Sequence, residues 1–88
     1  MNITFDAAKD EAKQAKHGVS LADAAAIEWE TVWLRRDDRR GYAETRMIGI
    51  GYIGLRLNGV VFTDRGDDRR IISLRKANAR EVASDAET

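Results

Sequence analysis

The chain has 88 residues, 34% of them charged, with 15 basic and 15 acidic side chains and a formal net charge of zero. This length predicts one small domain over residues 1–88 and excludes an enzyme built from two deep lobes. Cysteine is absent, which excludes a disulfide framework and a thiolate metal site and favours a reducing cytoplasmic location. The first residues lack a signal-peptide pattern, and no apolar run approaches the roughly 18 residues of a membrane span, so we expect a soluble protein without membrane contact.

The charges are unevenly distributed along the chain. Residues 1–34 carry a net charge of −3, residues 35–80 carry +6, and residues 81–88 carry −3. An arginine-rich middle between acidic ends predicts a locally positive surface that faces an anion. A surface that only keeps a small domain soluble has the same composition, so the charge pattern alone leaves both interpretations open.

The N-terminal part predicts a strand and a helix. Residues 1–5 alternate apolar and polar side chains, which is typical of a short edge strand. Asp6 is a suitable N-cap for a helix over about 7–17, and Gly18 stands where a left-handed residue would end it.

A second helix is predicted to begin at Ser20. Asp23 completes a capping-box pattern with Ser20, and Val19 is placed to pack on Ala24. Alanine is a good helix former with little bulk, so this helix is expected to lie close against a sheet. Its predicted buried side comprises Ala22, Ala25, Ala26 and Trp29. Both tryptophans of the chain are interpreted as core residues rather than ligand platforms, because large aromatic side chains dominate small cores.

The second half of the chain predicts strands. Residues 32–34 form a short strand or the exit of the second helix, and the charged stretch 35–42 is a loop. Three strands of an antiparallel meander follow, at 45–52, 55–63 and 69–75. Residues from about 78 onward predict a short C-terminal helix, with Asn78 or Ser73 as its possible cap.

Two turns compete between the first two of these strands. Asn58 and Gly59 form a strong hairpin signal, yet a turn there would leave a strand of only four residues, so we place the turn at 53–54. The next turn, at 64–68, is defined by turn-forming residues around a glycine. Gly49 and Gly51 share the face of Met47, where packing by the alanine helix is favoured over approach of a substrate. The result is an α+β fold with N-terminal helices and a C-terminal helix packed on an antiparallel sheet.

The strand at 69–75 carries arginine on both faces. Strict alternation sends Arg69, Ile71, Ser73 and Arg75 to one face, and Arg70, Ile72, Leu74 and Lys76 to the other. Because Ile72 and Leu74 would cover the core, the face of Arg69 and Arg75 is predicted to be an open cationic floor, extended by Arg46 and Arg56. Guanidinium groups bind phosphate bidentately and stay charged at any relevant pH, so such a floor suits a phosphodiester. A solvated sheet face has the same composition.

Other kinds of site are disfavoured by the residues present. His17 is the only histidine, and the aspartate pairs stand beside arginines that neutralise them, which disfavours a transition-metal site. No serine lies in a triad motif, and there is no phosphate-cradling glycine loop. What remains is cofactor-free and metal-free handling of RNA, in which the 2′-OH of the substrate is the nucleophile and the protein supplies a base, an acid and cations.

Five short motifs follow one another along the chain. They are F-D-x-x-K at Phe5 to Lys9, K-H-G-V-S at Lys16 to Ser20, E-T-R-M-I-G-I-G at Glu44 to Gly51, T-D-R-G at Thr63 to Gly66, and R-I-I-S-L-R-K-A at Arg70 to Ala77, followed by Glu81. With these motifs in this order, nearly the whole chain resembles the BrnT family of ribonuclease toxins, which have a RelE-like fold. The resemblance implies a toxin that cleaves RNA, halts translation and is kept inactive in a hetero-oligomer with a BrnA-like antitoxin. DNA is then bound only indirectly, through the antitoxin, which represses the operon.

The resemblance also suggests roles for single residues. Candidate catalytic cations are Arg46, Arg65, Arg75 and Lys76. Glu44 is the candidate base, because a carboxylate flanked by arginines is ionised. Lys76 or Arg75 would protonate or stabilise the leaving 5′ oxygen, although arginine is a poor acid. His17 is the rival acid or base, or else it interacts with a helix dipole. Candidate contacts to RNA phosphates are Arg56, Arg69, Arg70 and Arg80.

Two other functions compete with the nuclease. The chain departs from the family pattern in the loop before Glu44, which lacks a frequent histidine, and in its acidic C-terminal end. These departures favour a catalytically weak binding module that acts through its antitoxin. A DNA-binding regulator is disfavoured, because neither predicted N-terminal helix carries base-reading residues in a helix-turn-helix pattern.

Overall fold

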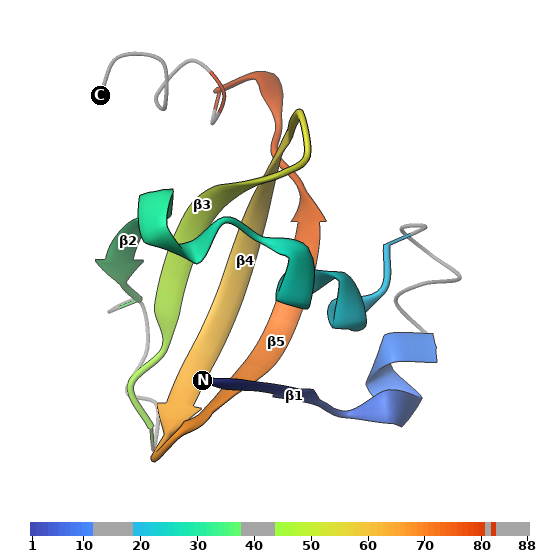
Figure 1. The fold of residues 1–88 in the computed structure, drawn as a ribbon, viewed down its shortest axis with the longest axis vertical. Coiled ribbons are helices and arrows are strands. Elements are labelled where there is room, and N and C mark those ends of the chain that lie inside the picture. The colour runs from blue at the N-terminus through green and yellow to red at the C-terminus, as the bar shows by residue number, and fades with distance from the viewer. Residues whose placement is uncertain (12–18, 38–43, 81, 83–88) are drawn as a thin grey trace.

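The computed structural model describes residues 1–11, 19–37, 44–80 and 82, which fold around one five-stranded sheet in the order β1-β5-β4-β3-β2 (Figure 1). Its strands are β1 (Asn2–Phe5), β2 (Trp33–Arg36), β3 (Met47–Ile53), β4 (Arg56–Arg65) and β5 (Asp68–Lys76). Two 3-10 helices, η1 (Leu21–Ala26) and η2 (Trp29–Thr31), cross one face of this sheet. Three positions singled out in the sequence, His17, Gly18 and Glu81, lie outside the described residues.

The sheet confirms the α+β class and extends the predicted meander. Strands β2 to β5 are antiparallel to their neighbours, and β1 is the edge strand that the alternation at 1–5 predicts. The pairing of β1 is parallel, with Phe5 opposite Ile71 of β5. Within the described residues, no helix is long and apolar enough to cross a membrane.

The two hairpin turns lie close to their predicted places. Gly54 and Leu55 connect β3 to β4, and Gly66 and Asp67 connect β4 to β5. Both glycines have positive φ, +60° at Gly54 and +59° at Gly66, which costs glycine little and other residues more. Asn58 and Gly59 lie inside β4, so the hairpin signal at these residues is overridden by the longer strand pairing.

A β-bulge in β5 changes which side chains share a face. Val61 of β4 pairs with Ser73, whereas the next residue, Phe62, pairs with Ile71, so that Ile72 is the extra residue. Ile71 and Leu74 are therefore both buried in the core, with 2% and 3% of their surfaces exposed. The predicted strict alternation is wrong for this strand, and with it the predicted floor that Arg69 and Arg75 would share.

The layer over the sheet is built from 3-10 turns, not from the predicted α-helix. Ser20 is the N-cap of η1, as predicted, and its hydroxyl accepts from the Ala22 N–H. The three-residue period of a 3-10 helix puts Leu21, Ala24 and Ile27 on the sheet side, where they are buried. The predicted buried side is wrong for Ala22, Ala25 and Ala26, which are exposed.

The core lies between η1 and the sheet and is centred on Phe62, Val60 and Ile71. Trp29 packs against this core as predicted, with its ring 5.4 Å from that of Phe62 in an edge-to-face arrangement. Trp33, by contrast, is 46% exposed on the edge strand β2, so its prediction as a core residue is wrong.

Gly49 and Gly51 allow the chain between η2 and β2 to lie directly on β3. A Cβ atom at Gly51 would come within 2.6 Å of Val32 Cγ2, and one at Gly49 within 2.8 Å of Val32 Cγ1. The predicted packing role of these glycines is thus confirmed, but the side chains that need the space are those of Val32, Ile27 and Leu34 rather than the alanines.

The start of the first helix is held next to β1 and η1 by hydrogen bonds to two aspartate side chains. Residues 7–11 are helical, and Asp6 Oδ1 accepts from the Lys9 N–H at 3.1 Å, as expected of an N-cap. One turn later the Asp10 carboxylate accepts from the Leu21 N–H at 2.6 Å and from the Ser20 hydroxyl. These bonds join the helix start to η1 and hold Asp6 and Lys9 next to the end of β1. At the other terminus, Ala79, Arg80 and Val82 are helical, following Asn78.

Candidate active site

Charged side chains from three parts of the chain line an open pocket of about 220 Å³. Its charged lining comprises Asp6, Lys9, Glu44, Arg46, Arg65 and Arg70, and Thr63 and Ile72 lie between them. Four cations against two carboxylates give the pocket a net positive charge. Such a pocket favours an anionic ligand.

The sheet register explains why these residues meet. Thr63 of β4 pairs with Arg70 of β5, and Arg65 pairs with Asp68 beside the turn. Thr63 and Arg65 point away from the side of Phe62, because successive side chains of a strand alternate. Arg46 immediately precedes β3, next to the same end of β4. The pocket therefore lies at the end of the sheet where β4 and β5 are joined.

Glu44 and Arg65 form a two-bonded ion pair within the pocket. Arg65 donates from Nε to Glu44 Oε2 at 2.8 Å and from Nη2 to Oε1. These hydrogen bonds hold the pKa of the Glu44 carboxyl below its ordinary value and raise the pKa of Arg65. Both side chains remain accessible, with 43% of Glu44 and 56% of Arg65 exposed. The pair is thus formed at the pocket surface, where a ligand can exchange with it.

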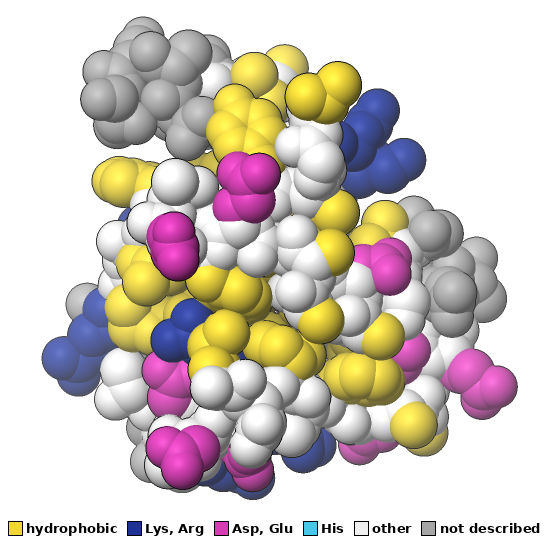
Figure 2. All heavy atoms as spheres, in the orientation of Figure 1, with side chains coloured by type: hydrophobic (Ala, Val, Ile, Leu, Met, Phe, Trp, Pro, Cys, Tyr) yellow, Lys and Arg dark blue, Asp and Glu magenta, His cyan; other side chains and the backbone are white. Residues whose placement is uncertain are grey.

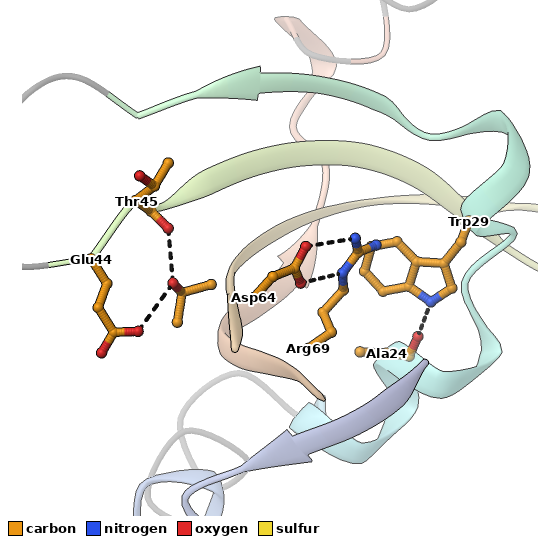
Figure 3. Close-up of polar contacts among 7 residues, drawn as sticks. Ala24, Trp29, Glu44, Thr45, Asp64 and Arg69 are labelled. Atoms are coloured by element: carbon orange, nitrogen blue, oxygen red, sulfur yellow. Dashed lines mark hydrogen bonds and ion pairs between the residues drawn. The ribbon is translucent and has the colours of Figure 1, made fainter. Parts of the chain in front are cut away.

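Thr63 fixes the segment that carries Glu44. Its side chain is buried, and its hydroxyl donates to the Thr45 carbonyl at 2.8 Å (Figure 3). The same oxygen lies 3.5 Å from Glu44 Oε2, a longer and weaker contact. A buried hydroxyl that satisfies a backbone carbonyl costs free energy to remove, so Thr63 is a support of Glu44 within the site.

Four of the predicted site residues meet in this pocket, five lie elsewhere, and His17 is outside the described residues. Arg75 extends over Gly59 and is five residues from Arg70 along β5, a separation of at most about 16 Å at a rise near 3.3 Å per residue. Lys76 ends the same strand. Arg56 follows the turn between β3 and β4, Arg80 follows Asn78, and Arg69 lies on the opposite face of the sheet. The candidate acid Lys76 is therefore distant from the candidate base Glu44.

Two residues of the pocket, Asp6 and Lys9, are absent from the sequence-predicted site. Both belong to the F-D-x-x-K motif at Phe5 to Lys9. The N–H bond from Lys9 and, to a lesser extent, the charges of Lys9 and Arg70 lower the pKa of Asp6. Asp6 and Lys9 are spaced by about one helical turn directly after a strand, and this pattern in the sequence could have indicated that both side chains belong to the site. Among the described residues, no three histidine, cysteine or acidic side chains gather as metal ligands would.

Comparison with known proteins identifies the family. A family model described as a ribonuclease toxin, BrnT, of a type II toxin-antitoxin system matches residues 5–81. This match begins at the last residue of β1, includes β2 to β5 and contains every residue that lines the pocket. No curated protein matches the chain at a significant level. The match confirms the resemblance carried by the five motifs: the chain belongs to the BrnT family of ribonuclease toxins of type II toxin-antitoxin systems.

Proposed function

We propose that the pocket around Glu44 is the active site of a metal-free endoribonuclease with a RelE-like fold, in a single domain over residues 1–88. The observation that carries this proposal is the convergence of four cations, Lys9, Arg46, Arg65 and Arg70, with the carboxylates of Glu44 and Asp6 in an accessible pocket. Cleavage of cytoplasmic RNA by this site inhibits translation.

The three guanidinium groups of the pocket bind the scissile phosphate. Arginine presents a planar fork that matches two phosphate oxygens, and it stays charged throughout the reaction. Arg65 and Arg70 come from β4 and β5 and Arg46 from the residue just before β3, so three separate segments supply guanidinium groups to one pocket. As negative charge builds on the non-bridging oxygens in the transition state, such preorganised cations stabilise it.

Glu44 is the base that takes the proton of the attacking 2′-OH. Its lowered pKa keeps it ionised, but both of its oxygens accept hydrogen bonds from Arg65 in the free protein. A phosphate that draws Arg65 away frees both carboxylate oxygens from these hydrogen bonds and raises the proton affinity of Glu44. The 2′ oxygen then attacks phosphorus, its proton moves to Glu44, and the bond from phosphorus to the 5′ oxygen breaks. The products are a 2′,3′-cyclic phosphate and a 5′-OH.

Lys9 is the group that protonates the leaving 5′ oxygen. It lines the pocket, and its ammonium group carries three rotatable N–H donors that can be directed at a single oxygen atom. His17 stays a rival for this role. Arg75 and Lys76 are sequence-predicted catalytic cations, and Arg56, Arg69, Arg70 and Arg80 are sequence-predicted contacts to RNA phosphates. Of these, Arg70 lines the pocket. Because Arg75 and Lys76 lie toward the other end of β5, the role proposed for them is contact with RNA that extends beyond the pocket.

The partner of the toxin is a protein antitoxin, since the family belongs to type II systems. A BrnA-like antitoxin neutralises the chain in a hetero-oligomer, and it supplies the contact with operator DNA. The alternative of a catalytically weak module draws support from the closed Glu44–Arg65 pair, which occupies both the proposed base and one proposed phosphate ligand in the free protein.

Induction in a bacterial host, with total RNA analysed for new ends, tests the proposal. We expect growth arrest and fragments with 5′-OH and 2′,3′-cyclic phosphate ends for the parent chain, and neither for Arg70→Ala. Arg75→Ala compares the contribution of the far end of β5 with that of the pocket, and we expect this variant to keep part of the cleavage activity. Purified chain should cleave RNA equally well with and without a chelator. Intact RNA from a folded, soluble parent chain would support the weak binding module instead.

A further inference from the structure

Arg69 stands out among the sequence-predicted RNA contacts because its side chain is already fully engaged. It donates from Nε to Asp64 Oδ1 at 2.8 Å and from Nη2 to Asp64 Oδ2 at 3.0 Å (Figure 3). Only 19% of the Arg69 side chain is exposed, against 49% of Asp64. An RNA phosphate would have to displace a bidentate carboxylate from a mostly buried arginine.

Two aromatic rings hold the same guanidinium group. Arg69 Cζ lies 4.7 Å from the ring centroid of Trp29 and 4.2 Å from that of Phe62. Phe62 is buried, and the Trp29 ring is itself fixed, because Nε1 donates to the Ala24 carbonyl at 3.1 Å. Figure 2 shows this face of the molecule, where basic side chains are set among hydrophobic ones below the 3-10 helices. Stacking and bidentate pairing together fix both the position and the plane of Arg69.

The clamp, by which we mean Arg69 held by Asp64, Trp29 and Phe62, lies in the same hairpin as two residues of the pocket on the other face of the sheet. Asp64 and Arg69 are direct partners across β4 and β5. The neighbouring partners are Thr63 with Arg70 on one side and Arg65 with Asp68 on the other. Arg65 and Arg70, which are proposed phosphate ligands, are therefore each one residue away from the clamp. Only the Arg65–Asp68 pair and the short turn at Gly66 and Asp67 lie beyond Asp64 and Arg69.

We propose that Arg69 is a positioning residue of the ribonuclease site and not an RNA contact. By tying Asp64 to Trp29 and Phe62, Arg69 holds the end of the β4–β5 hairpin against the core, and the hairpin then presents Arg65 and Arg70 to the pocket. The ends of hairpins open more readily than their middles, so without the clamp these two arginines would sample orientations that miss the phosphate. This inference rests on the proposed function of the pocket.

Steady-state cleavage of a short RNA by Asp64→Asn, Arg69→Lys and Arg69→Met tests the positioning role. Asp64→Asn is the mildest change, since it keeps the shape of the side chain and touches nothing in the pocket. We expect kcat to fall about tenfold in Asp64→Asn and in Arg69→Met, because misplaced groups lose rate while binding is retained. KM should change less than twofold. The double variant should be no slower than Arg69→Met, since both changes break the same interaction.

The salt dependence of RNA binding distinguishes positioning from direct contact. Binding of an uncleavable 2′-deoxy analogue is measured between low and high salt for the same variants. Each phosphate contact contributes about 0.7 to the slope of log affinity against log salt concentration for a single strand. A positioning residue leaves this slope unchanged when it is replaced. A decrease of about that amount in Arg69→Met, together with tighter RNA binding by Asp64→Asn, would overturn the proposal.

Arg70→Ala separates failure of this inference from failure of the proposed active site. If Arg70→Ala abolishes cleavage while Asp64→Asn cleaves like the parent chain, the pocket is the active site and Arg69 has only a structural role. If Arg70→Ala cleaves normally, the pocket itself is misassigned and the positioning role is lost with it. Tryptophan fluorescence and a thermal unfolding midpoint, recorded for each variant, verify that the compared proteins are folded.

Discussion

Arg69 and Arg70 are adjacent and chemically identical, yet they lie on opposite faces of β5 in opposite environments. Arg69 has a carboxylate and two aromatic rings around it and is mostly buried. Arg70 lines a pocket in which cations outnumber carboxylates. Arginine in the first environment contributes to the fold, and arginine in the second is arranged for an anion. The partners of an arginine, not its place in a basic stretch, decide between the two roles.

The largest effect is expected for loss of a cation on the pocket face. Arg70→Ala should lower the single-turnover rate of RNA cleavage at least about 100-fold, because a preorganised donor to the transition state is removed. Arg35→Ala is a matched control, since Arg35 is an exposed arginine of the opposite edge strand β2. Equal losses in both variants would indicate a diffuse electrostatic attraction of RNA and would remove the distinction between pocket and surface.

On the core face, a methyl group added at Gly51 should affect stability and leave the chemistry intact. The new Cβ would lie 2.6 Å from Val32 Cγ2 and 3.1 Å from Ile27 Cγ2, so these side chains must move. Such overpacking costs about 1–3 kcal/mol of the free energy of unfolding, measured by urea denaturation. Gly59→Ala is the matched control, because its Cβ would meet the Arg75 guanidinium at an ordinary 3.5 Å. Similar losses in the two variants would mean that β3 is not covered by Val32.

A smaller loss of stability is expected when Trp29 is replaced with Phe. The variant keeps an aromatic ring beside Phe62 and Arg69 but removes the donor to the Ala24 carbonyl. The buried Ala24 carbonyl keeps its bond from the Ile27 N–H at 3.2 Å, so the variant loses one of two hydrogen bonds at a cost of about 1 kcal/mol. Urea denaturation measures the change, and the folded variant should cleave RNA at a rate near that of the parent chain. A cleavage loss larger than that of Asp64→Asn would show that Trp29, rather than Asp64, is the main support of Arg69.

The contrast between the two arginines also marks what the sequence can predict. Turn residues and period-2 alternation locate β1, β3, β4 and β5 within a few residues, because these signals are local. The bulge at Ile72 is not local: one extra residue is tolerated where Ile71 and Leu74 can both reach the core. Because of this bulge, Arg69 lies on the opposite face of β5 from Ser73 and Arg75, whereas strict alternation predicts one shared face. The basic residues around the bulge do not indicate its presence in the sequence.

The residues of the candidate site follow from the sequence only in part, again because sequence signals are local. Glu44, Arg46, Arg65 and Arg70 were named from motifs and charge, and the structure brings them together. Arg75 is separated from these four residues by its distance along β5, and the composition of the chain gives no information on such distances. The alanine-rich stretch predicts an α-helix, because alanine favours that structure. The structure has a 3-10 helix there instead, since Leu21, Ala24 and Ile27 are spaced by three residues and are all buried in this conformation.

The smallest effect concerns the pH dependence of the Glu44–Arg65 pair on the pocket face. The pKa of Glu44 is lower in the folded protein than its ordinary value of 4.5, mainly through the hydrogen bonds from Arg65. A depressed folded pKa contributes stability that is fully present above the unfolded value and is lost as pH falls through the folded one. The pair is exposed, so the contribution is small and is further screened by salt.

Urea denaturation of the parent chain and of Glu44→Gln, at low salt from pH 7 to pH 3, detects this contribution. The parent chain should be slightly more stable at pH 5 to 7. The difference should shrink as pH falls below about 4.5, because the amide of the variant does not titrate while the Glu44 carboxylate takes up a proton. A difference that stays constant over this range would mean that Glu44 is not paired with Arg65 in solution. The carboxylate would then be free to act as a base without any exchange of Arg65, and the resting pocket would be open rather than closed.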